Sequence, residues 1–191
     1  METEITTDIS PCKYKIYHAF EDALLHTNFS KLTVSALSKV AQVSQSTFYF
    51  HFIDINDLLE KYITDHLLSE LLRRDIQAHP GDGLKYLLDT IDQNRETILS
   101  VWNDISANDL HYLYVKLSGQ VIKTVFVSKL STDGHSIQSC RLNDYVRYCA
   151  VGIKGVLEAY LRRECPLSDD EVIQSLIAYT GACYSTMLME P

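Results

Sequence analysis

A short run of amide and hydroxyl side chains lies in the first third of the chain: Ser44, Gln45, Ser46 and Thr47. Such groups exchange hydrogen bonds with base edges in the major groove of duplex DNA. Tyr49 and His51 follow, with polar tips that suit the phosphate oxygens of the backbone. These residue types predict contact with DNA, and the alternative is an exposed helix surface without a ligand.

Hydrophobic spacing and capping residues predict the elements that would hold these side chains. Helices are expected over Thr33–Val40 and Ser44–Phe50, joined by a turn of three residues. This pattern is typical of a helix-turn-helix, in which the second helix enters the major groove. Three capping residues each lie between an apolar pair, the arrangement of a hydrophobic staple: Leu32-Thr33 with Leu37, Val43-Ser44 with Phe48, and Ile53-Asp54 with Leu58.

The remainder of the chain also reads as helical, so the expected fold class is all-α. A first helix over 11–27 has Ser10 as its N-cap, and a longer one covers 54–78. After a break at 79–83, helices are expected over 84–105, 109–130 and 138–163, and a last one starts at Ser168 with a capping box to Glu171. The expected core of the N-terminal helices consists of Phe20, Leu24, Leu37, Val40, Phe48 and Phe52.

The stretch from Leu32 to Phe52 resembles the DNA-binding signature of TetR-family transcriptional regulators. The most diagnostic part is Thr47-Phe48-Tyr49-Phe50-His51-Phe52, followed by Asp57-Leu58-Leu59. The resemblance implies a homodimer that binds a near-palindromic operator, with 1–11 as a tail, 12–53 as the helix-turn-helix domain and 54–191 as a helical domain for an effector and for dimerisation. The implied DNA contacts are Thr33, Lys39, Ser44, Gln45, Ser46, Thr47, Tyr49 and His51.

Two segments of the helical domain expected over 54–191, namely 86–94 and 152–157, resemble more loosely a Firmicutes-type branch of the family that includes DhaS-like activators. Three positions depart from the TetR pattern. Gln42 stands where the family has Gly in the turn, and a left-handed conformation costs a residue other than Gly about 1 kcal/mol. Gln45 and Ile55 stand where the family has basic residues, which removes two contacts to DNA.

The net charge of −8 argues against a nucleic-acid binder when the chain is taken whole. Residues 12–53 are different, because they carry more lysines than acids: Lys13, Lys15, Lys31 and Lys39 against Glu21 and Asp22. The segment with the helix-turn-helix pattern is therefore mildly basic. So few cations predict few phosphate contacts and a shallow salt dependence of binding.

Aromatic side chains with polar tips in the helical body are candidates for an effector pocket: Trp102, His111, Tyr112 and Tyr145. The alternative is that they belong to the core. Small residues mark the last two expected helices: Ala150, Gly152, Gly155 and Ala159, then Ala178, Gly181 and Ala182. They predict close helix packing in a four-helix dimer interface, with packing inside one chain as the alternative.

Enzymatic function has little support in the sequence, since no nucleophile elbow, phosphate-binding glycine loop or metal-ligand pair occurs. The five cysteines lack a C-x-x-C pattern, so we expect no zinc site, no cofactor and a reducing cytoplasm. No signal peptide or membrane span is expected. A protein-interaction module with weak or no DNA binding remains the second interpretation, and both repression and activation fit the residues.

Overall fold

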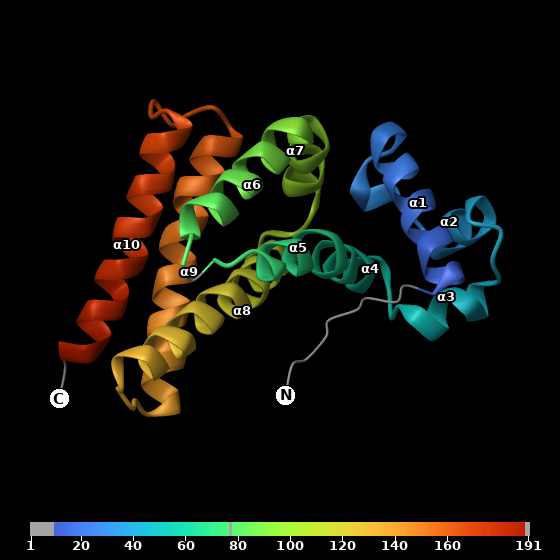
Figure 1. Ribbon diagram of the computed structural model, residues 1–191. Coiled ribbons are helices and arrows are strands. Elements are labelled where there is room, and N and C mark those ends of the chain that lie inside the picture. Colours follow the sequence, from blue (N-terminus) through green and yellow to red (C-terminus); the bar gives the residue numbers. More distant parts are fainter. Residues whose placement is uncertain (1–9, 77, 190–191) are drawn as a thin grey trace. The chain divides into compact units, whose positions relative to one another are not determined.

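A computed structural model describes residues 10–76 and 78–189 (Figure 1). These residues form helices and no strand, which confirms the all-α expectation. The chain forms two compact units, which are described separately. The N-terminal unit comprises the residues up to Ser69 together with Glu96–Leu110, and the C-terminal unit comprises Glu70–Arg95 and the residues from His111 onward.

The helices of the N-terminal unit are α1 (Pro11–His26), η1 (Phe29–Lys31), α2 (Val34–Val40), α3 (Gln45–His51), α4 (Ile55–Ile63) and the π-helical turn η2 (Thr64–Leu68). Helix α7 (Arg95–Asp104) belongs to this unit from Glu96 onward. Helix α1 packs against α2 and α3. Phe20 and Phe48 are fully buried, as expected. Val40 is 59% exposed, so its expected place in the core is wrong. Leu37 is buried as expected, and Ala41, four residues later on the same helix face, is buried instead of Val40.

The long helix expected over 54–78 is interrupted. Helix α4 continues through η2 into α5 (Ser69–Arg73) and ends there. Beyond this end Ile76 is buried, and a Cβ atom at Gly83 would lie 2.8 Å from its side chain. The chain therefore leaves the helix before residue 78, and the glycine permits a close approach to the following helix.

The single helix expected over 84–105 is wrong in two ways. Helix α6 (Pro80–Gln93) already begins at Pro80, which occupies the first turn, where a missing N–H costs nothing. The helix ends at Asn94, which leaves helical geometry at φ −118° and ψ 20°. Its side-chain amide donates to the carbonyl of Thr90 at 3.0 Å, so this carbonyl keeps a partner at the break before α7.

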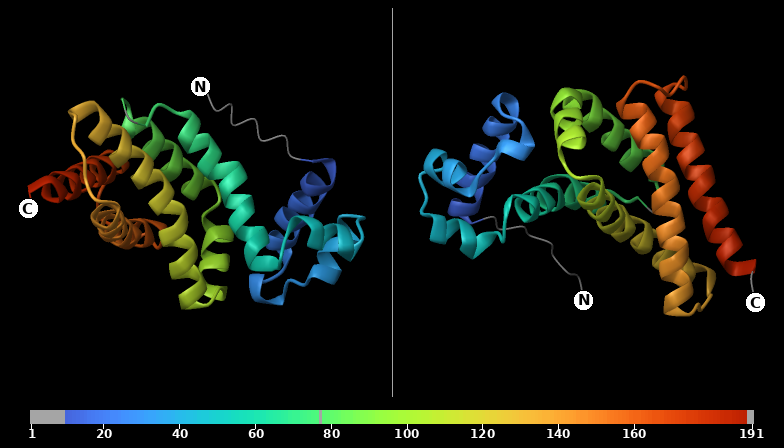
Figure 2. Two further views of the ribbon diagram at one scale, coloured as in Figure 1. Left: turned by 90° about the horizontal axis from the view of Figure 1, so that it is seen from below. Right: turned by 180° about the vertical axis from the view of Figure 1, so that it is seen from behind.

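The C-terminal unit is built on three long helices: α8 (Ala107–Asp133), α9 (Ser139–Leu161) and α10 (Asp169–Met189). Helices α9 and α10 lie side by side and antiparallel (Figures 1 and 2). The core shared by α8, α9 and α10 contains Phe126, Cys149, Tyr184 and Met187. The expected capping box is present, because Glu171 Oε2 accepts from the amide of Ser168 at 2.8 Å.

Two further observations concern the environment of the chain. Among the helices of the described residues, none is both long and apolar enough to cross a membrane. All five cysteines are free thiols, of which Cys12 and Cys140 are exposed and Cys149 is buried.

Candidate nucleic-acid interface

The turn between α2 and α3 has the left-handed geometry expected from the position of Gln42. Its φ is 55°, and the amide of Val43 donates to the carbonyl of Ser38 at 3.0 Å. A hydrogen bond across five residues around a left-handed residue is a Schellman motif, which ends a helix and redirects the chain. Gln42 thus adopts the left-handed conformation that glycine adopts without a steric cost, and it does so with backbone strain.

Thr33 and Ser44 are the N-caps of the two helices. Thr33 Oγ1 accepts from the amide of Ala36 at 3.2 Å, and Ser44 Oγ accepts from the amide of Thr47 at 3.0 Å. Each cap satisfies a backbone donor that a helix start leaves without a partner. The caps are local in sequence, which is why the helix starts were predictable.

The hydroxyls at the start of α3 are linked to one another. Ser44 Oγ lies 2.7 Å from Ser46 Oγ and 2.8 Å from Thr47 Oγ1. This cluster fixes the two hydroxyls against the cap, so they form a preorganised polar patch. Gln45 is exposed and has the longest side chain of the run. Its amide is therefore the group with the greatest reach from this end of α3.

Phe50 has no expected role from the sequence, yet it is 83% exposed on α3. Tyr49 beside it is 57% exposed. Phe48 and Phe52 are buried, and their spacing of four residues places position 50 on the outer face. The helical period could have revealed this aromatic surface from the sequence.

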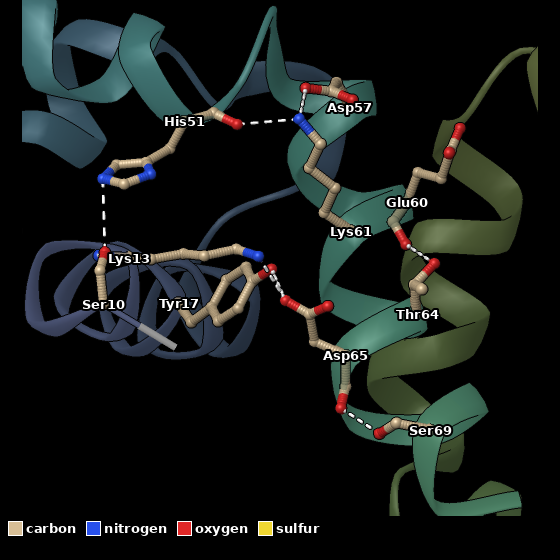
Figure 3. Close-up of polar contacts among 10 residues, drawn as sticks. All are labelled: Ser10, Lys13, Tyr17, His51, Asp57, Glu60, Lys61, Thr64, Asp65 and Ser69. Carbon is tan, nitrogen blue, oxygen red and sulfur yellow. Dashed lines mark hydrogen bonds and ion pairs between the residues drawn. The ribbon is translucent and has the colours of Figure 1, made fainter. Parts of the chain in front are cut away.

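His51 sits in a more structural setting than the sequence suggested (Figure 3). Its Nε2 lies 3.5 Å from Ser10 Oγ, and its carbonyl accepts from Lys61 Nζ at 2.8 Å. Burial, together with the charges of Lys13 and Lys61, lowers the pKa of His51 below its ordinary value of 6.5. The lowered pKa favours the neutral ring, which offers a phosphate a hydrogen bond without a charge.

The basic side chains of the N-terminal unit are not equally available. Lys13 Nζ lies 2.6 Å from Asp65 Oδ2, and only 22% of the lysine side chain and 14% of the aspartate side chain are exposed. Lys15, Lys31 and Lys39 are exposed. No sequence signal links residues 13 and 65, and this pairing makes the interface less basic than its lysine count implies.

The candidate effector residues are divided between the two units. Trp102 lies on α7 in the N-terminal unit, whereas His111, Tyr112 and Tyr145 lie in the C-terminal unit. Tyr112 is 63% exposed, and Tyr145 packs against the core shared by α8, α9 and α10. The assignment of these four residues to an effector pocket stays a prediction.

The small residues of α9 and α10 serve two different purposes. A Cβ atom at Gly152 would clash with the ring and hydroxyl of Tyr179 on α10, so this glycine permits packing inside the chain. A Cβ atom at Gly155 or Gly181 would have no atom within 4 Å. Ala178 and Ala182 are exposed. The alternative of intrachain packing thus holds for Gly152, while the exposed small residues are open to a partner.

No protein-family model and no curated protein sequence matches the chain. Among solved structures, the chain is similar to one described as the dihydroxyacetone kinase operon activator DhaS. The two share 17% sequence identity over 92% of this chain and 97% of that chain, with a TM-score of 0.61. Since so low an identity is evidence of architecture alone, the comparison shows that this chain has the same helical fold as that activator.

Proposed function

We propose that the chain is a cytoplasmic, homodimeric transcriptional regulator of the TetR kind, which binds a near-palindromic operator through α3. The observation that carries the proposal is the start of α3, where exposed Gln45 stands beside a fixed hydroxyl cluster. A capped helix that follows a Schellman turn is the geometry of a helix-turn-helix. The fold shared with an operon activator supports the same interpretation.

The proposed dimer forms through the exposed small-residue face of α9 and α10. Gly155, Gly181, Ala178 and Ala182 permit close approach of a second copy, and Val151 adds apolar surface that is 46% exposed. A two-fold axis through this face would use the same residues on both copies. Two recognition helices about 34 Å apart would then reach successive major grooves.

The charge distribution predicts how operator affinity depends on salt. Lys15, Lys31 and Lys39 are the exposed lysines in 12–53, since Lys13 pairs with Asp65. If all three contact phosphate in both copies, the slope of log K against log salt would reach about −5. If fewer of these lysines contact phosphate, the slope is shallower and the affinity is lower. The test is therefore best carried out near 50 mM salt, where electrostatic binding is stronger.

The test of DNA binding is fluorescence anisotropy with duplex DNA from the region upstream of the protein's own coding sequence, and with duplexes selected from a random library. We expect Gln45→Ala to weaken selected-site binding about tenfold, as for loss of a bidentate base contact. Gln120→Ala, at an exposed glutamine on α8 away from the proposed dimer face, is the matched control. No binding by a confirmed dimer at about 50 mM salt would refute operator recognition.

The dimer is tested with Val151→Arg, which places a charge on the proposed face while leaving the core intact. Val127→Arg on α8 is the control, because this valine is also 47% exposed. Analytical ultracentrifugation should show a monomer for the first variant and a dimer for the second. A dimer that withstands Val151→Arg would place the interface elsewhere.

Effector control is a further part of the proposal. A small ligand near Tyr145 and Tyr112 would act by binding one arrangement of the dimer more tightly than the other. Ligand-induced quenching of Trp102 fluorescence would not by itself identify the site. Loss of a ligand-dependent change in operator affinity in Tyr145→Phe, with basal affinity retained, would identify it.

A protein-interaction module is the second candidate, favoured by a specific observation. Phe50 and Ile53 are 83% and 76% exposed, and Lys13 is neutralised by Asp65. An apolar surface on and after α3 suits a protein partner better than a phosphate backbone. A stoichiometric complex lost in Phe50→Asp but retained in Gln45→Ala would favour this candidate. Neither candidate gives the chain a catalytic step.

A further inference from the structure

Asp65 receives two hydrogen bonds from α1 through one carboxylate oxygen. Lys13 Nζ donates to Oδ2 at 2.6 Å and Tyr17 Oη at 2.7 Å (Figure 3). The two donors are four residues apart, so they lie on the same face of α1. Tyr17 is 1% exposed and the Asp65 side chain 14% exposed. A charge this well shielded interacts more strongly with its partners than an exposed surface pair does.

Asp65 lies within the π-helical turn η2, which follows α4 directly. Side-chain hydroxyls bind backbone carbonyls on either side of this carboxylate. Thr64 Oγ1 donates to the carbonyl of Glu60 at 2.8 Å, and Ser69 Oγ donates to the carbonyl of Asp65 itself. Single π-helical turns within helices often occur at functional positions. Here the turn places a carboxylate against α1.

The same helical run also contacts the end of α3. Lys61, one turn before Asp65, donates to the carbonyl of His51 at 2.8 Å and to Asp57 Oδ2 at 2.9 Å. The ring of His51 lies 3.5 Å from Ser10 Oγ at the start of α1. Figure 3 shows these contacts as a closed circuit from α1 through η2 and α4 to α3. Displacement of α1 would therefore be transmitted to the end of the recognition helix.

We propose that Asp65 is a positioning residue for DNA recognition, which acts through Lys13 and Tyr17 to fix α1 and, through α1, the orientation of α3. This inference rests on the proposed function. It also assigns Lys13 to a structural ion pair instead of a phosphate contact. Asp65 lies outside 12–53 in the sequence, yet in this proposal it helps to orient the helix-turn-helix.

The sign of the charge change gives a sharp test. Asp65→Asn removes a negative charge, so electrostatics alone would strengthen binding to DNA. The positioning role predicts the opposite, a loss of operator affinity of about tenfold. Asp89→Asn is the matched control, because it makes the same charge change at an exposed ion pair with Lys85 on α6. We expect the control to bind with unchanged or slightly higher affinity.

Exchanging the charges of Lys13 and Asp65 distinguishes a positioning role of the pair from an effect of losing either side chain. Lys13→Asp should weaken operator binding more than Asp65→Asn, because it places two carboxylates together. The double variant Lys13→Asp/Asp65→Lys restores an opposite pair and should recover part of the affinity. Affinity equal to or tighter than wild type in Asp65→Asn, or no recovery in the exchange variant, would overturn the proposal.

Hydrogen exchange provides a readout that does not depend on DNA. In Asp65→Asn the amides of α1 should exchange about tenfold faster, whereas those of α10 should be unchanged. A wild-type protein that binds no DNA would refute the proposed function, and α1 exchange would then decide the positioning contact by itself. Unchanged exchange in α1 would overturn that contact, and faster exchange in α10 as well would indicate general destabilisation.

Discussion

The two units of the chain differ in where their polar contacts fall. In the N-terminal unit, contacts between residues far apart in sequence gather at α1 and the end of α3, next to the candidate interface: Lys13–Asp65, Tyr17–Asp65, Tyr62–Glu21 and Ser10–His51. A further contact of this unit, Ser30–Asp104, joins η1 to α7. In the C-terminal unit such contacts are spread along the helices, as in Tyr184–Asp133, Tyr179–Tyr148 and Tyr160–Asp169. An apolar core joins the C-terminal half of α8, the N-terminal half of α9 and the C-terminal end of α10.

The difference between the units distinguishes contacts that orient helices from contacts that stabilise the fold. A hydrogen bond or ion pair is directional, but its net contribution is about 1 kcal/mol. Apolar packing contributes more per side chain and does not depend on one bond angle. We therefore expect changes in the C-terminal core to act mainly on the free energy of unfolding. Changes around α1 and α3 should act more on operator affinity.

The largest effect is expected from Phe126→Ala. Phe126 is 1% exposed, and its ring lies 5.5 Å from that of Tyr184. Loss of a fully buried aromatic ring should lower the free energy of unfolding by about 3–5 kcal/mol, measured by urea denaturation. Val127→Ala, at the exposed neighbour, should change it by less than about 0.5 kcal/mol. A loss below about 1 kcal/mol in Phe126→Ala would show that this core is loosely packed.

A smaller effect is expected from Gly152→Ala. The added methyl group would displace Tyr179, whose hydroxyl donates to the carbonyl of Tyr148 at 3.2 Å. Because the clash is with the far end of a side chain, we expect a loss of about 1–2 kcal/mol by thermal or urea unfolding. Gly119→Ala on α8 is the control, since its Cβ would make an ordinary contact at 3.6 Å with Val146. The control should gain up to about 1 kcal/mol through helix propensity.

Gln42→Gly tests the turn of the N-terminal unit. Glycine adopts φ 55° without a steric cost, but it also gives the unfolded chain more freedom. The two effects predict a change between zero and a gain of about 1 kcal/mol in unfolding free energy. Operator affinity should stay the same, because the turn geometry is kept. A loss above about 1 kcal/mol would mean that the Gln42 side chain makes a stabilising contact.

The smallest effect is the pH dependence contributed by His51. Its pKa in the folded protein lies below 6.5, so the unfolded chain binds a proton first as the pH falls. The stability from neutral His51 is complete above pH 6.5 and is lost as the pH falls toward the lowered value. Wild type should therefore lose stability relative to His51→Gln between pH 7.5 and 5.5, measured as a difference in urea midpoints. A constant difference would contradict the lowered pKa.

Local features of the fold were predictable from the sequence. The caps Ser10, Thr33, Ser44 and Ser168 and the strained position of Gln42 all act within five residues, where residue type decides backbone geometry. One staple did not hold, because Ile53 is 76% exposed and has little surface against Leu58.

Features set by distant contacts were not predictable. Val40 was expected in the core, yet the neighbouring Ala41 is buried because α1 meets that side of α2. A single long helix was expected over 84–105, but the helix breaks before Arg95. The guanidinium of this residue donates to the carbonyls of Tyr160 and Leu161 at the end of α9. Periodicity describes one helix at a time, so it cannot locate a break that depends on a second helix.

The sequence by itself determined the all-α class, the helix starts with side-chain caps and the polar run at 44–47, since these follow from propensity, capping and periodicity. Only the tertiary structure decided that Lys13 is held by Asp65, that the pKa of His51 is lowered, and that Gly152 serves packing within the chain. The physical reason is the same in each case. Charge state and close packing depend on neighbours that folding brings together from distant parts of the sequence, such as Lys13 and Asp65, and a one-dimensional pattern does not contain them.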